Sequence, residues 1–578
     1  MYKNTYSAWL NDPAIDDTTK AELTAIADND KEIEDRFYRE LEFGTGGLRG
    51  VIGAGTNRLN IYTVRKATQG LANYILASDA YQSGMGVAIA HDCRRMSPEF
   101  STEAALVLNA NGIKTYTFDS LRPTPLLSFT VRHLGCVAGI VVTASHNPPE
   151  YNGYKVYWAD GGQCPYPRDE AIISEVQKVT DFNMVKTMSR AEAEVKGLFN
   201  IAAADVDDMF IQNVKAQSLN PEIIPDSDIK IVYTPLHGAG NISVQRSLKE
   251  MGFKHVFVVK EQESPDGNFP TVAYPNPEDK LAFELSLKLA KEKDADIVVA
   301  TDPDSDRVGV AIKHADEYML LNGNMTGVLL ADYLVSQMKA KGKLPANGAI
   351  VSTIVSTDMT RAIAEANGLT YFEVLTGFKY VGEKIKEFET TGSHSYVFGF
   401  EESYGYLAGT YARDKDAVVA TMLICEAAAF YKAQGLTLYD AMLKLYEKYG
   451  LYREGVEAIT LKGVDGVANI KKIMAALREN PPQSLAGSDV VEARDYNARI
   501  SKNLQTGAVC DITLPVSDVL YFQTADGTWT CVRPSGTEPK LKLYFGTQLV
   551  AGASVADGDA KLAMIAKDIR AMVDRVLI

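Results

Sequence analysis

A serine hydroxyl in a turn and a group of closely spaced carboxylates are the side chains of this sequence best suited to chemistry. Ser145 lies in the segment 143–148, directly after the apolar run 137–142. That run is short and rich in β-branched residues, which is typical of a strand in a sheet covered on both faces. Asn147 precedes two prolines, which lack a backbone N–H and stop regular structure. We therefore expect Ser145 at the edge of a sheet, where a nucleophile would sit; taken alone, the motif also fits an ordinary loop serine.

Three aspartates alternate along one turn between the apolar runs 297–300 and 308–312. They are Asp302, Asp304 and Asp306. Carboxylates without a nearby Cys or His suit a hard divalent cation such as Mg²⁺, which keeps a place for a phosphate oxygen. An EF-hand is excluded because Arg307 stands where that loop needs Gly, and Lys313 where it needs Glu. In haloacid dehalogenase-like phosphotransferases, Thr or Val takes the place of the third carboxylate. A solvated turn remains the alternative.

Two more polar loops follow expected strands. They are 399–405 together with 413–416, behind the strand 395–398, and 533–540, behind the strands 519–522 and 529–532. Asp526-Gly527 between the last two strands is a strong hairpin signal. Four strand ends thus each lead into a loop with charged or hydroxyl side chains.

The elements between these loops predict the fold class. Helix-like segments such as 280–292 and 417–431 alternate with the strands, which favours α/β units around mostly parallel sheets. After the hairpin comes an amphipathic helix, which indicates a C-terminal α+β domain. Its apolar stripe is Leu562, Ile565, Ile569, Met572, Val573 and Val576. The loops follow no fixed period, so a solenoid or propeller is excluded.

Composition excludes several classes of protein. A chain of 578 residues is too long for one core, so several domains are expected. The net charge of −15 argues against nucleic-acid or anionic-membrane partners. No apolar run approaches a membrane span, and the polar N-terminus lacks the apolar core of a secretory signal, so we expect a cytoplasmic protein. Six scattered cysteines without C-x-x-C spacing favour neither zinc nor a disulfide scaffold.

Together, these motifs resemble the α-D-phosphohexomutase superfamily, and within it the phosphoglucomutase branch that also holds phosphopentomutases and glucose 1,6-bisphosphate synthases. The resemblance runs from the motif Phe-Gly-Thr-Gly-Gly-Leu-Arg-Gly at 43–50 to the loop 533–540, in the family's order. It implies the four-domain phosphohexomutase architecture, with three mixed α/β sheet domains and a C-terminal α+β domain. The implied spans are 1–205 with the phosphoserine loop, 206–320 with the metal-binding loop, 321–450 with the sugar-binding loop and 451–578 with the phosphate-binding loop.

The resemblance also implies a role for each site residue. Ser145 would carry the phosphoryl group and, with the three aspartates, would hold Mg²⁺. Glu401 and Ser403 would bind sugar hydroxyls. The remaining substrate-binding residues would be Thr376, Gly377, Phe378, Lys379, Arg307, Arg413, Arg533, Ser535, Gly536, Thr537 and Lys540. The substrate would be a small sugar phosphate, glucose 1,6-bisphosphate would be both activator and intermediate, and the chain would act as a monomer or homodimer.

Phosphoryl transfer to a hydroxyl also needs a base and an acid. The candidates are His146, Lys155 and Lys415, all on motifs that match the family. His146 can equally orient the turn, and Lys415 can pair with phosphate. Arg49 completes the catalytic set as a stabiliser of charge, because a guanidinium stays protonated. Asp92 and Arg94 are expected to support the cleft, and Asp92 fits a helix cap equally well.

The chain departs from the family pattern at Gly46, where many relatives have Ser or Ala, and at Ala417, where Gly is frequent. The second change affects the backbone beside Lys415. Three functions remain open. One is a mutase acting on glucose 1- and 6-phosphate, with pentose phosphates as an alternative substrate. The others are a glucose 1,6-bisphosphate synthase and a catalytically silent sugar-phosphate-binding protein.

Overall fold

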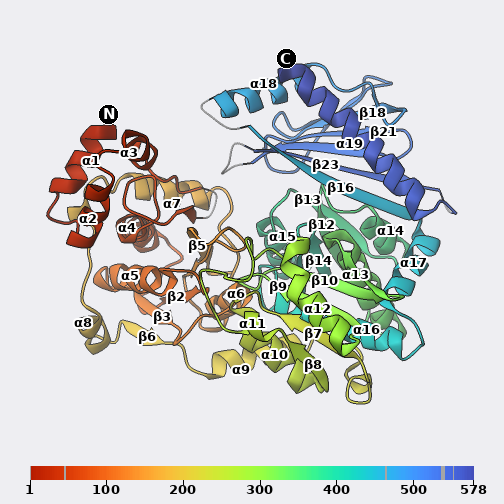
Figure 1. The fold of residues 1–578 in the computed structure, drawn as a ribbon, viewed down its shortest axis with the longest axis horizontal. Helices are drawn as coiled ribbons and strands as arrows, with labels where there is room; N and C mark the ends of the chain where they lie inside the picture. Colours follow the sequence, from red (N-terminus) through yellow and green to blue (C-terminus); the bar gives the residue numbers. More distant parts are fainter. Residues whose placement is uncertain (1, 45–46, 462–464, 536–539, 551, 578) are drawn as a thin grey trace. The chain divides into compact units, whose positions relative to one another are not determined.

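The computed structural model describes residues 2–44, 47–461, 465–535, 540–550 and 552–577 (Figure 1). Two compact units divide the chain. The first holds residues 1–323, 378–399 and 403–437, and the second holds 324–377, 400–402 and 438–578. Among the described residues, no helix is long and apolar enough to cross a membrane.

The first sheet is mixed and has the order β1-β5-β4-β2-β3-β6. Its strands are β1 (Gly47–Val51), β2 (Gly86–His91), β3 (Lys114–Thr117), β4 (Ala138–Val142), β5 (Tyr151–Trp158) and β6 (Phe199–Ile201). β4 runs parallel to β2 and antiparallel to β5. Its side chains pack into two hydrophobic cores, one of which contains Ile140 and the other Val141. This confirms the strand buried on both faces that the sequence predicted.

Helices surround this sheet. They are α1 (Tyr2–Asn11), α2 (Asp17–Ala25), α3 (Asp30–Phe37), α4 (Ile61–Ala77), α5 (Ser97–Ala110), α6 (Thr124–His133), α7 (Arg168–Gln177), α8 (Arg190–Val195) and α9 (Asp205–Lys215). α4 packs with α5 and α7, whereas α6 packs on β2 and β4. Both faces of the strand that precedes Ser145 are therefore covered.

The second sheet has the order β11-β10-β9-β7-β8. Its strands are β7 (Lys230–Thr234), β8 (His255–Val258), β9 (Ile297–Thr301), β10 (Val308–His314) and β11 (Glu317–Leu321), with helices α10 (Gly240–Met251), α11 (Lys260–Glu263) and α12 (Glu284–Lys293). A 3₁₀ turn at Lys280–Phe283 begins the segment that the sequence predicted as one helix from 280. β9 and β10 pair antiparallel, so the aspartate turn joins two neighbouring strands.

The third sheet has the order β13-β12-β14-β15. Its strands are β12 (Gly348–Thr353), β13 (Thr370–Val374), β14 (Ser395–Glu401) and β15 (Gly405–Ala408), and the helices of this region are α13 (Gly323–Ala340), α14 (Met359–Ala366), α15 (Lys379–Thr391), α16 (Ala417–Lys432) and α17 (Leu438–Tyr449). β14 extends three residues beyond the predicted end at 398, because Gly399 and the fully buried Phe400 continue the strand to Glu401. Glu401 thus ends a strand instead of lying inside a loop.

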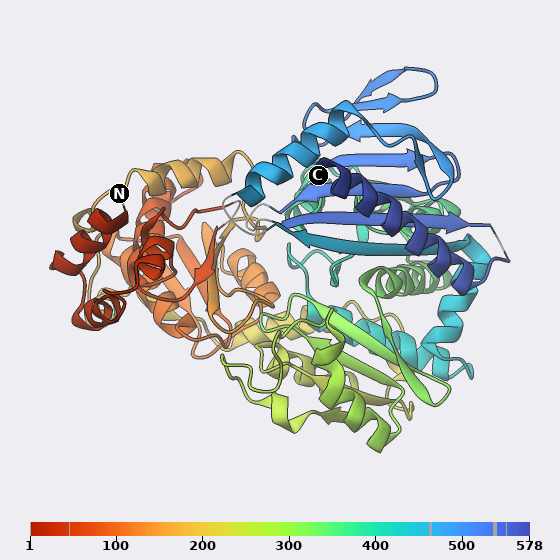
Figure 2. The ribbon, with the colours of Figure 1, turned by 45° about the horizontal axis from the view of Figure 1, so that its top comes forward.

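The fourth sheet is antiparallel, in the order β16-β23-β22-β21-β18-β19-β20. Its strands are β16 (Leu451–Thr460), β18 (Ser488–Asp495), β19 (Ile500–Asn503), β20 (Val509–Asp511), β21 (Leu520–Thr524), β22 (Trp529–Pro534) and β23 (Lys540–Leu549), and β17 (Ser484–Leu485) pairs with β18. The predicted hairpin is β21 and β22, with Gly527 at φ +80°. Helices α18 (Asp465–Glu479) and α19 (Val555–Leu577) pack on this sheet, which confirms the α+β class of this segment (Figure 2).

The buried stripe of α19 generates a stability prediction. Ile569 is buried in the core between α19 and the fourth sheet, whereas Met564 on the same helix is about half exposed. Ile569→Ala should lower the free energy of unfolding by about 2–5 kcal/mol, because it leaves a cavity in a packed core. Met564→Ala is the control and should change it by less than about 0.5 kcal/mol. Chemical denaturation followed by circular dichroism measures both; equal effects would contradict the packing described here.

Candidate functional site

The turn after β4 holds Ser145 in a left-handed backbone conformation, with φ +53°. Its backbone N–H donates to the hydroxyl of Thr143 at 2.8 Å. On β5, Gly153 fits tightly against this turn, since a Cβ there would lie 2.4 Å from the carbonyl oxygen of Thr143. A left-handed non-glycine residue persists only where its surroundings fix it. Ser145 is therefore placed by its neighbours rather than by its own preference.

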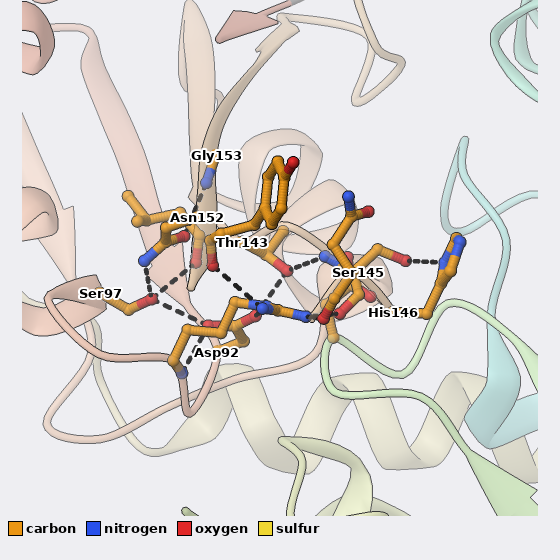
Figure 3. Close-up of polar contacts among 12 residues, drawn as sticks. Asp92, Ser97, Thr143, Ser145, His146, Asn152 and Gly153 are labelled. Atoms are coloured by element: carbon orange, nitrogen blue, oxygen red, sulfur yellow. Dashed lines mark hydrogen bonds and ion pairs between the residues drawn. The ribbon is translucent and has the colours of Figure 1, made fainter. Parts of the chain in front are cut away.

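Arg94 supplies much of the fixation of the turn from Thr143 to Ser145, which Figure 3 shows. Its side chain is fully buried and its guanidinium donates to backbone carbonyls of the serine turn. The acceptors are Ser145 O at 2.6 Å, Pro148 O at 2.8 Å, Tyr151 O at 3.0 Å and Asn147 O. A planar fork with five N–H donors can satisfy several carbonyls of one loop at once. Arg94 thus clamps the turn that presents Ser145.

Asp92 connects this clamp to the sheet. One carboxylate oxygen accepts from the Thr143 hydroxyl at 2.6 Å, and the other accepts from the Ser97 hydroxyl at 2.8 Å and the Arg94 backbone N–H at 2.9 Å. The expected supporting role of Asp92 and Arg94 therefore has a structural basis in these contacts. Asp92 is not the N-cap of α5, because Met96 holds that position.

The aspartate turn meets the serine turn directly. The Ser145 hydroxyl donates to Oδ2 of Asp302 at 2.8 Å. Asp302, Asp304 and Asp306 are buried, and ligand atoms from all three lie within 4.8 Å of one another. Burial and the neighbouring carboxylates raise the pKa of Asp302 well above its usual value and also raise that of Asp306. Three negative charges crowded in a dry turn need a positive partner.

Orphaned oxygen atoms show that this turn fits a divalent cation. Oδ1 of Asp304 and Oδ1 of Asp306 are buried without a hydrogen-bond partner. A buried carboxylate oxygen without a partner is costly, and a hard cation satisfies it. The acidic triad with the Ser145 hydroxyl beside it is therefore a candidate metal centre of oxygen ligands.

Two lysines from other elements already counter part of this charge. Lys155 on β5 places Nζ 2.9 Å from Oδ2 of Asp304, and Lys415 places Nζ 3.1 Å from Oδ2 of Asp306. Burial alone would raise the pKa of Asp304, but Lys155 lowers it below its usual value. The structure thus brings two of the three proton-transfer candidates, Lys155 and Lys415, to the aspartate turn.

The third candidate, His146, lies next to the serine hydroxyl. Its Nδ1 is 3.1 Å from Oγ of Ser145. Burial, together with the positive charges of Arg307 and Arg49, lowers the pKa of His146 well below its usual value, so the imidazole is neutral at pH 7. Arg49 reaches the same turn through Oδ1 of Asn147 at 3.3 Å, and Arg307 pairs with Glu278 at 2.8 Å. Arg49 and Arg307 thus place positive charge near His146.

Several residues that the sequence analysis passed over also hold the aspartate turn. Thr124, at the start of α6, donates its backbone N–H to the carbonyl of Asp304 at 2.9 Å and its hydroxyl to Oδ2 of the same residue at 3.1 Å. Gly238 and Gly240 pack against Pro303 and Ser305 more closely than any Cβ would allow. The glycine-rich segment after β7 was a visible signal for this contact, whereas nothing local marked Thr124.

Arg413 already has several partners within the protein. Its side chain is 2% exposed and its guanidinium pairs with Glu389 and donates to the carbonyls of Thr410 and Ala412. These contacts are those of a structural ion pair, and the substrate-binding role of Arg413 stays a prediction. Nζ of Lys379 lies 3.7 Å from Oδ2 of Asp169. The ring of Phe378 lies against Lys415, with 5.6 Å between Nζ of Lys415 and the ring centroid.

The second unit holds its own cluster of predicted residues. The Arg533 guanidinium donates to the hydroxyl of Thr376, which is followed by Gly377 at φ +114°. Glu402, next to Glu401, accepts from Thr353 at 3.1 Å. Burial and the Glu401 charge raise the pKa of Glu402 to about 7. The expected sugar loop thus carries two adjacent carboxyl groups with different surroundings.

The rest of the predicted phosphate loop is partly described. The backbone N–H of Ser535 donates to the carbonyl of Lys540 at 2.8 Å across the loop. Gly536 and Thr537 lie outside the described residues. Ser403, in the first unit, directly precedes Tyr404, whose carbonyl accepts from Val308 N at the start of β10. The sugar-loop serine is therefore tied in sequence to the strand that follows the aspartate turn.

Comparison with known proteins gives four consecutive matches to family models. Residues 40–182, 208–315 and 322–449 match the alpha/beta/alpha domains I, II and III of phosphoglucomutase/phosphomannomutase, and residues 462–562 match its C-terminal domain. The matches cover most of the chain and occur in order. Their bounds come from the family models, and the spans predicted from the sequence remain a prediction.

Similar proteins agree with these models. A phosphoglucomutase of Staphylococcus epidermidis is 37% identical over 515 residues, which are 89% of this chain and 92% of that protein. A phosphoglucomutase of Staphylococcus aureus is 36% identical over 519 residues, covering 89% and 91%. Among solved structures, pp63/parafusin of Paramecium superposes with a TM-score of 0.69 at 16% identity, covering 93% of this chain and 95% of that one. A phosphoglucomutase/phosphomannomutase family protein of Burkholderia thailandensis gives 0.65 at 22%, covering 92% and 97%. The two structures support the fold alone.

Cation binding at the aspartate turn should depend on pH. Because the pKa values of Asp302 and Asp306 are raised, these groups hold protons at a higher pH than usual, and a bound cation must displace them. Affinity for Mg²⁺ or Mn²⁺ should therefore rise with pH, with proton release detectable by calorimetry in buffers of different ionisation enthalpy.

Matched variants locate this binding. Asp302→Asn should weaken cation affinity at least about tenfold, since it removes a charged oxygen ligand. Asp316→Asn, in the exposed turn after β10, should leave the affinity unchanged. Affinity that is the same from pH 5.5 to 7.5, or equal in the two variants, would show that the cation binds elsewhere.

Proposed function

The chain belongs to the phosphoglucomutase/phosphomannomutase family, and from this membership we propose that it is an enzyme that interconverts glucose 1-phosphate and glucose 6-phosphate. The relatives that are 36–37% identical over 89% of the chain are phosphoglucomutases. The observation that carries the proposal is the contact of the Ser145 hydroxyl with a buried acidic triad suited to a cation. This pairing is what a phosphoserine enzyme requires.

Ser145 is the phosphoryl carrier in this proposal. Phosphorylated Ser145 gives its phosphoryl group to the free hydroxyl of the sugar monophosphate: a new P–O bond to the sugar forms, and the P–O bond to Oγ breaks. Glucose 1,6-bisphosphate is the intermediate, and its other phosphoryl group returns to Ser145 after the sugar reorients. Phosphoryl transfer depends mainly on positioning and charge neutralisation. Arg94 and Asp92 supply the positioning, because they hold the turn in place.

The three aspartates, with an oxygen on Ser145, would hold Mg²⁺. When bound, the cation neutralises charge that develops on the transferred phosphoryl oxygens. The orphaned carboxylate oxygens of Asp304 and Asp306 support this assignment. Arg49 and Arg307 add positive charge beside the serine, as their effect on the pKa of His146 indicates.

Lys155, Lys415 and His146 are the candidates for proton transfer, because the attacking hydroxyl loses a proton and the departing Oγ of Ser145 takes one up. His146 is neutral at pH 7 and lies beside Oγ, so it can accept a proton there. Both lysines lie against the metal turn, where the hydroxyl of the substrate would approach.

Substrate recognition would use several of the predicted loops. Glu401 and Ser403 would bind sugar hydroxyls, and Thr376, Gly377, Phe378 and Lys379 would help select the sugar. Arg533, Ser535 and Lys540, with Gly536 and Thr537, would hold the distal phosphate. Arg533 supports this role, because its guanidinium donates to a neutral hydroxyl that a phosphate can replace. The substrate is a small soluble sugar phosphate, consistent with a cytoplasmic enzyme.

The test is turnover of glucose 1-phosphate with Mg²⁺ and catalytic glucose 1,6-bisphosphate. Ser145→Ala should reduce kcat at least about a thousandfold, because the phosphoryl carrier is lost. Ser101→Ala is the control, since this buried hydroxyl on α5 in the same domain has no hydrogen-bond partner. Full activity of Ser145→Ala would overturn the proposal.

An assay with several sugar 1-phosphates then identifies the preferred substrate. Glucose, mannose, glucosamine, ribose and deoxyribose 1-phosphates should be compared by kcat/KM, with and without the bisphosphate. Glucose 1-phosphate should give the highest value. A higher value for either pentose would make the enzyme a phosphopentomutase, and stoichiometric accumulation of the bisphosphate would make it a synthase.

A further inference from the structure

Strand β5 sends two neighbouring side chains of one face toward the metal turn. Lys155 and Tyr157 are two residues apart, so they point to the same side of the sheet. Lys155 contacts Asp304, and the hydroxyl of Tyr157 donates to Oδ2 of Asp414 at 2.7 Å. Tyr157 is fully buried and Asp414 is 4% exposed. A buried tyrosine hydroxyl therefore holds a buried carboxylate.

The other oxygen of Asp414 holds Lys415. Oδ1 accepts from Nζ of Lys415 at 2.8 Å and from the backbone N–H of the same residue at 2.8 Å. Burial alone would raise the pKa of Asp414, but the ammonium of Lys415 and the hydroxyl of Tyr157 keep it below its usual value. Asp414 thus remains a carboxylate that joins Tyr157 to Lys415.

Lys415 has contacts on several sides. Its Nζ lies 2.8 Å from Asp414, 3.1 Å from Oδ2 of Asp306 and 5.6 Å from the centroid of the Phe378 ring. A lysine side chain has four rotatable bonds and loses considerable conformational entropy when it is held in one conformation. Contacts on several sides restrict where its ammonium can go.

The two lysines differ in what fixes them. The carboxylates that pair with Lys155 are Asp304 and, at 3.8 Å, Asp306, both in the aspartate turn. Lys415 has in addition Asp414, which lies outside that turn and is itself fixed by Tyr157. Lys415 can therefore keep its place when the carboxylates of the turn are engaged by a ligand.

We propose that Tyr157 and Asp414 are a positioning pair that fixes the ammonium of Lys415 beside the metal turn and so sets where this lysine exchanges a proton with the reacting hydroxyl. The inference rests on the proposed mutase function. Neither Tyr157 nor Asp414 touches the substrate in this proposal; both act through Lys415. Proton transfer is sensitive to such placement, because displacing a reacting group by about 1 Å can cost on the order of a hundredfold in rate.

Strand β5 also offers a matched control. Tyr154 is fully buried like Tyr157, but it lies in the core on the opposite face of the sheet, where the hydroxyl of Thr68 donates to it at 3.1 Å. Tyr157→Phe and Tyr154→Phe each remove one buried hydroxyl and keep the ring. Both should therefore fold, and both should lower the unfolding temperature by a few degrees.

The two variants should separate in catalysis. Tyr157→Phe should lower kcat for glucose 1-phosphate about tenfold, with KM and the half-saturating Mg²⁺ concentration within about twofold of the parent, because the lysine is displaced while the binding groups remain. Tyr154→Phe should keep the parent's kcat. Asp414→Asn, which keeps an oxygen acceptor, should retain more activity than Asp414→Ala.

Two different results would contradict the proposed positioning pair of Tyr157 and Asp414. Equal kcat for Tyr157→Phe and Tyr154→Phe would mean that the Tyr157 hydroxyl is structural only. A parallel shift in the Mg²⁺ requirement would mean that it acts through Asp306 and the metal turn instead. If the parent and Tyr154→Phe also fail to turn over glucose 1-phosphate, the proposed function has failed rather than the positioning pair.

Discussion

The concentration of negative charge in one buried turn is the constraint on which the rest of the site depends. Asp302, Asp304 and Asp306 lie within reach of a single ion, and two of their oxygen atoms have no hydrogen-bond partner. Taking three carboxylates out of water is unfavourable unless positive charge comes with them. Lys155 and Lys415 arrive from separate parts of the first unit and contact this turn. The same charge that suits a cation is therefore also partly neutralised by the two lysines that the proposed mechanism uses for proton transfer.

A second constraint is the backbone conformation of the turn that holds Ser145. Ser145 adopts a left-handed conformation that a serine avoids unless it is fixed, and Arg94 fixes it by donating to several carbonyls of the same loop. Asp92 keeps the position of Arg94 and Thr143 relative to the sheet. Buried Arg94 can thus support the proposed phosphoryl carrier through the backbone of its turn, without touching the substrate. This explains why two charged residues are buried beside a reactive hydroxyl.

The sequence predicted the elements that carry the site better than their contacts. The run before Ser145 and the aspartate turn were identified because short, continuous apolar runs leave a local signal, and both strands are present. The predicted end of β14 at 398 was wrong. Buried Gly399 and Phe400 continue a strand that propensity alone would stop. Thr124 and Tyr157 left no signal, since their partners lie about 180 and 260 residues away in the chain. Contacts of that kind depend on tertiary packing, which local patterns do not encode.

Two arginines on predicted substrate loops differ in the acceptors that their guanidinium groups contact. Arg413 is paired with the carboxylate of Glu389, so a phosphate would have to displace a full negative charge to reach it. Arg533 donates to the neutral hydroxyl of Thr376. Exchanging that hydroxyl for a phosphate oxygen replaces a neutral acceptor by a charged one, which strengthens the hydrogen bond. For the proposed distal phosphate, the partner that each arginine already has thus matters more than the number of arginines in a chain with a net charge of −15.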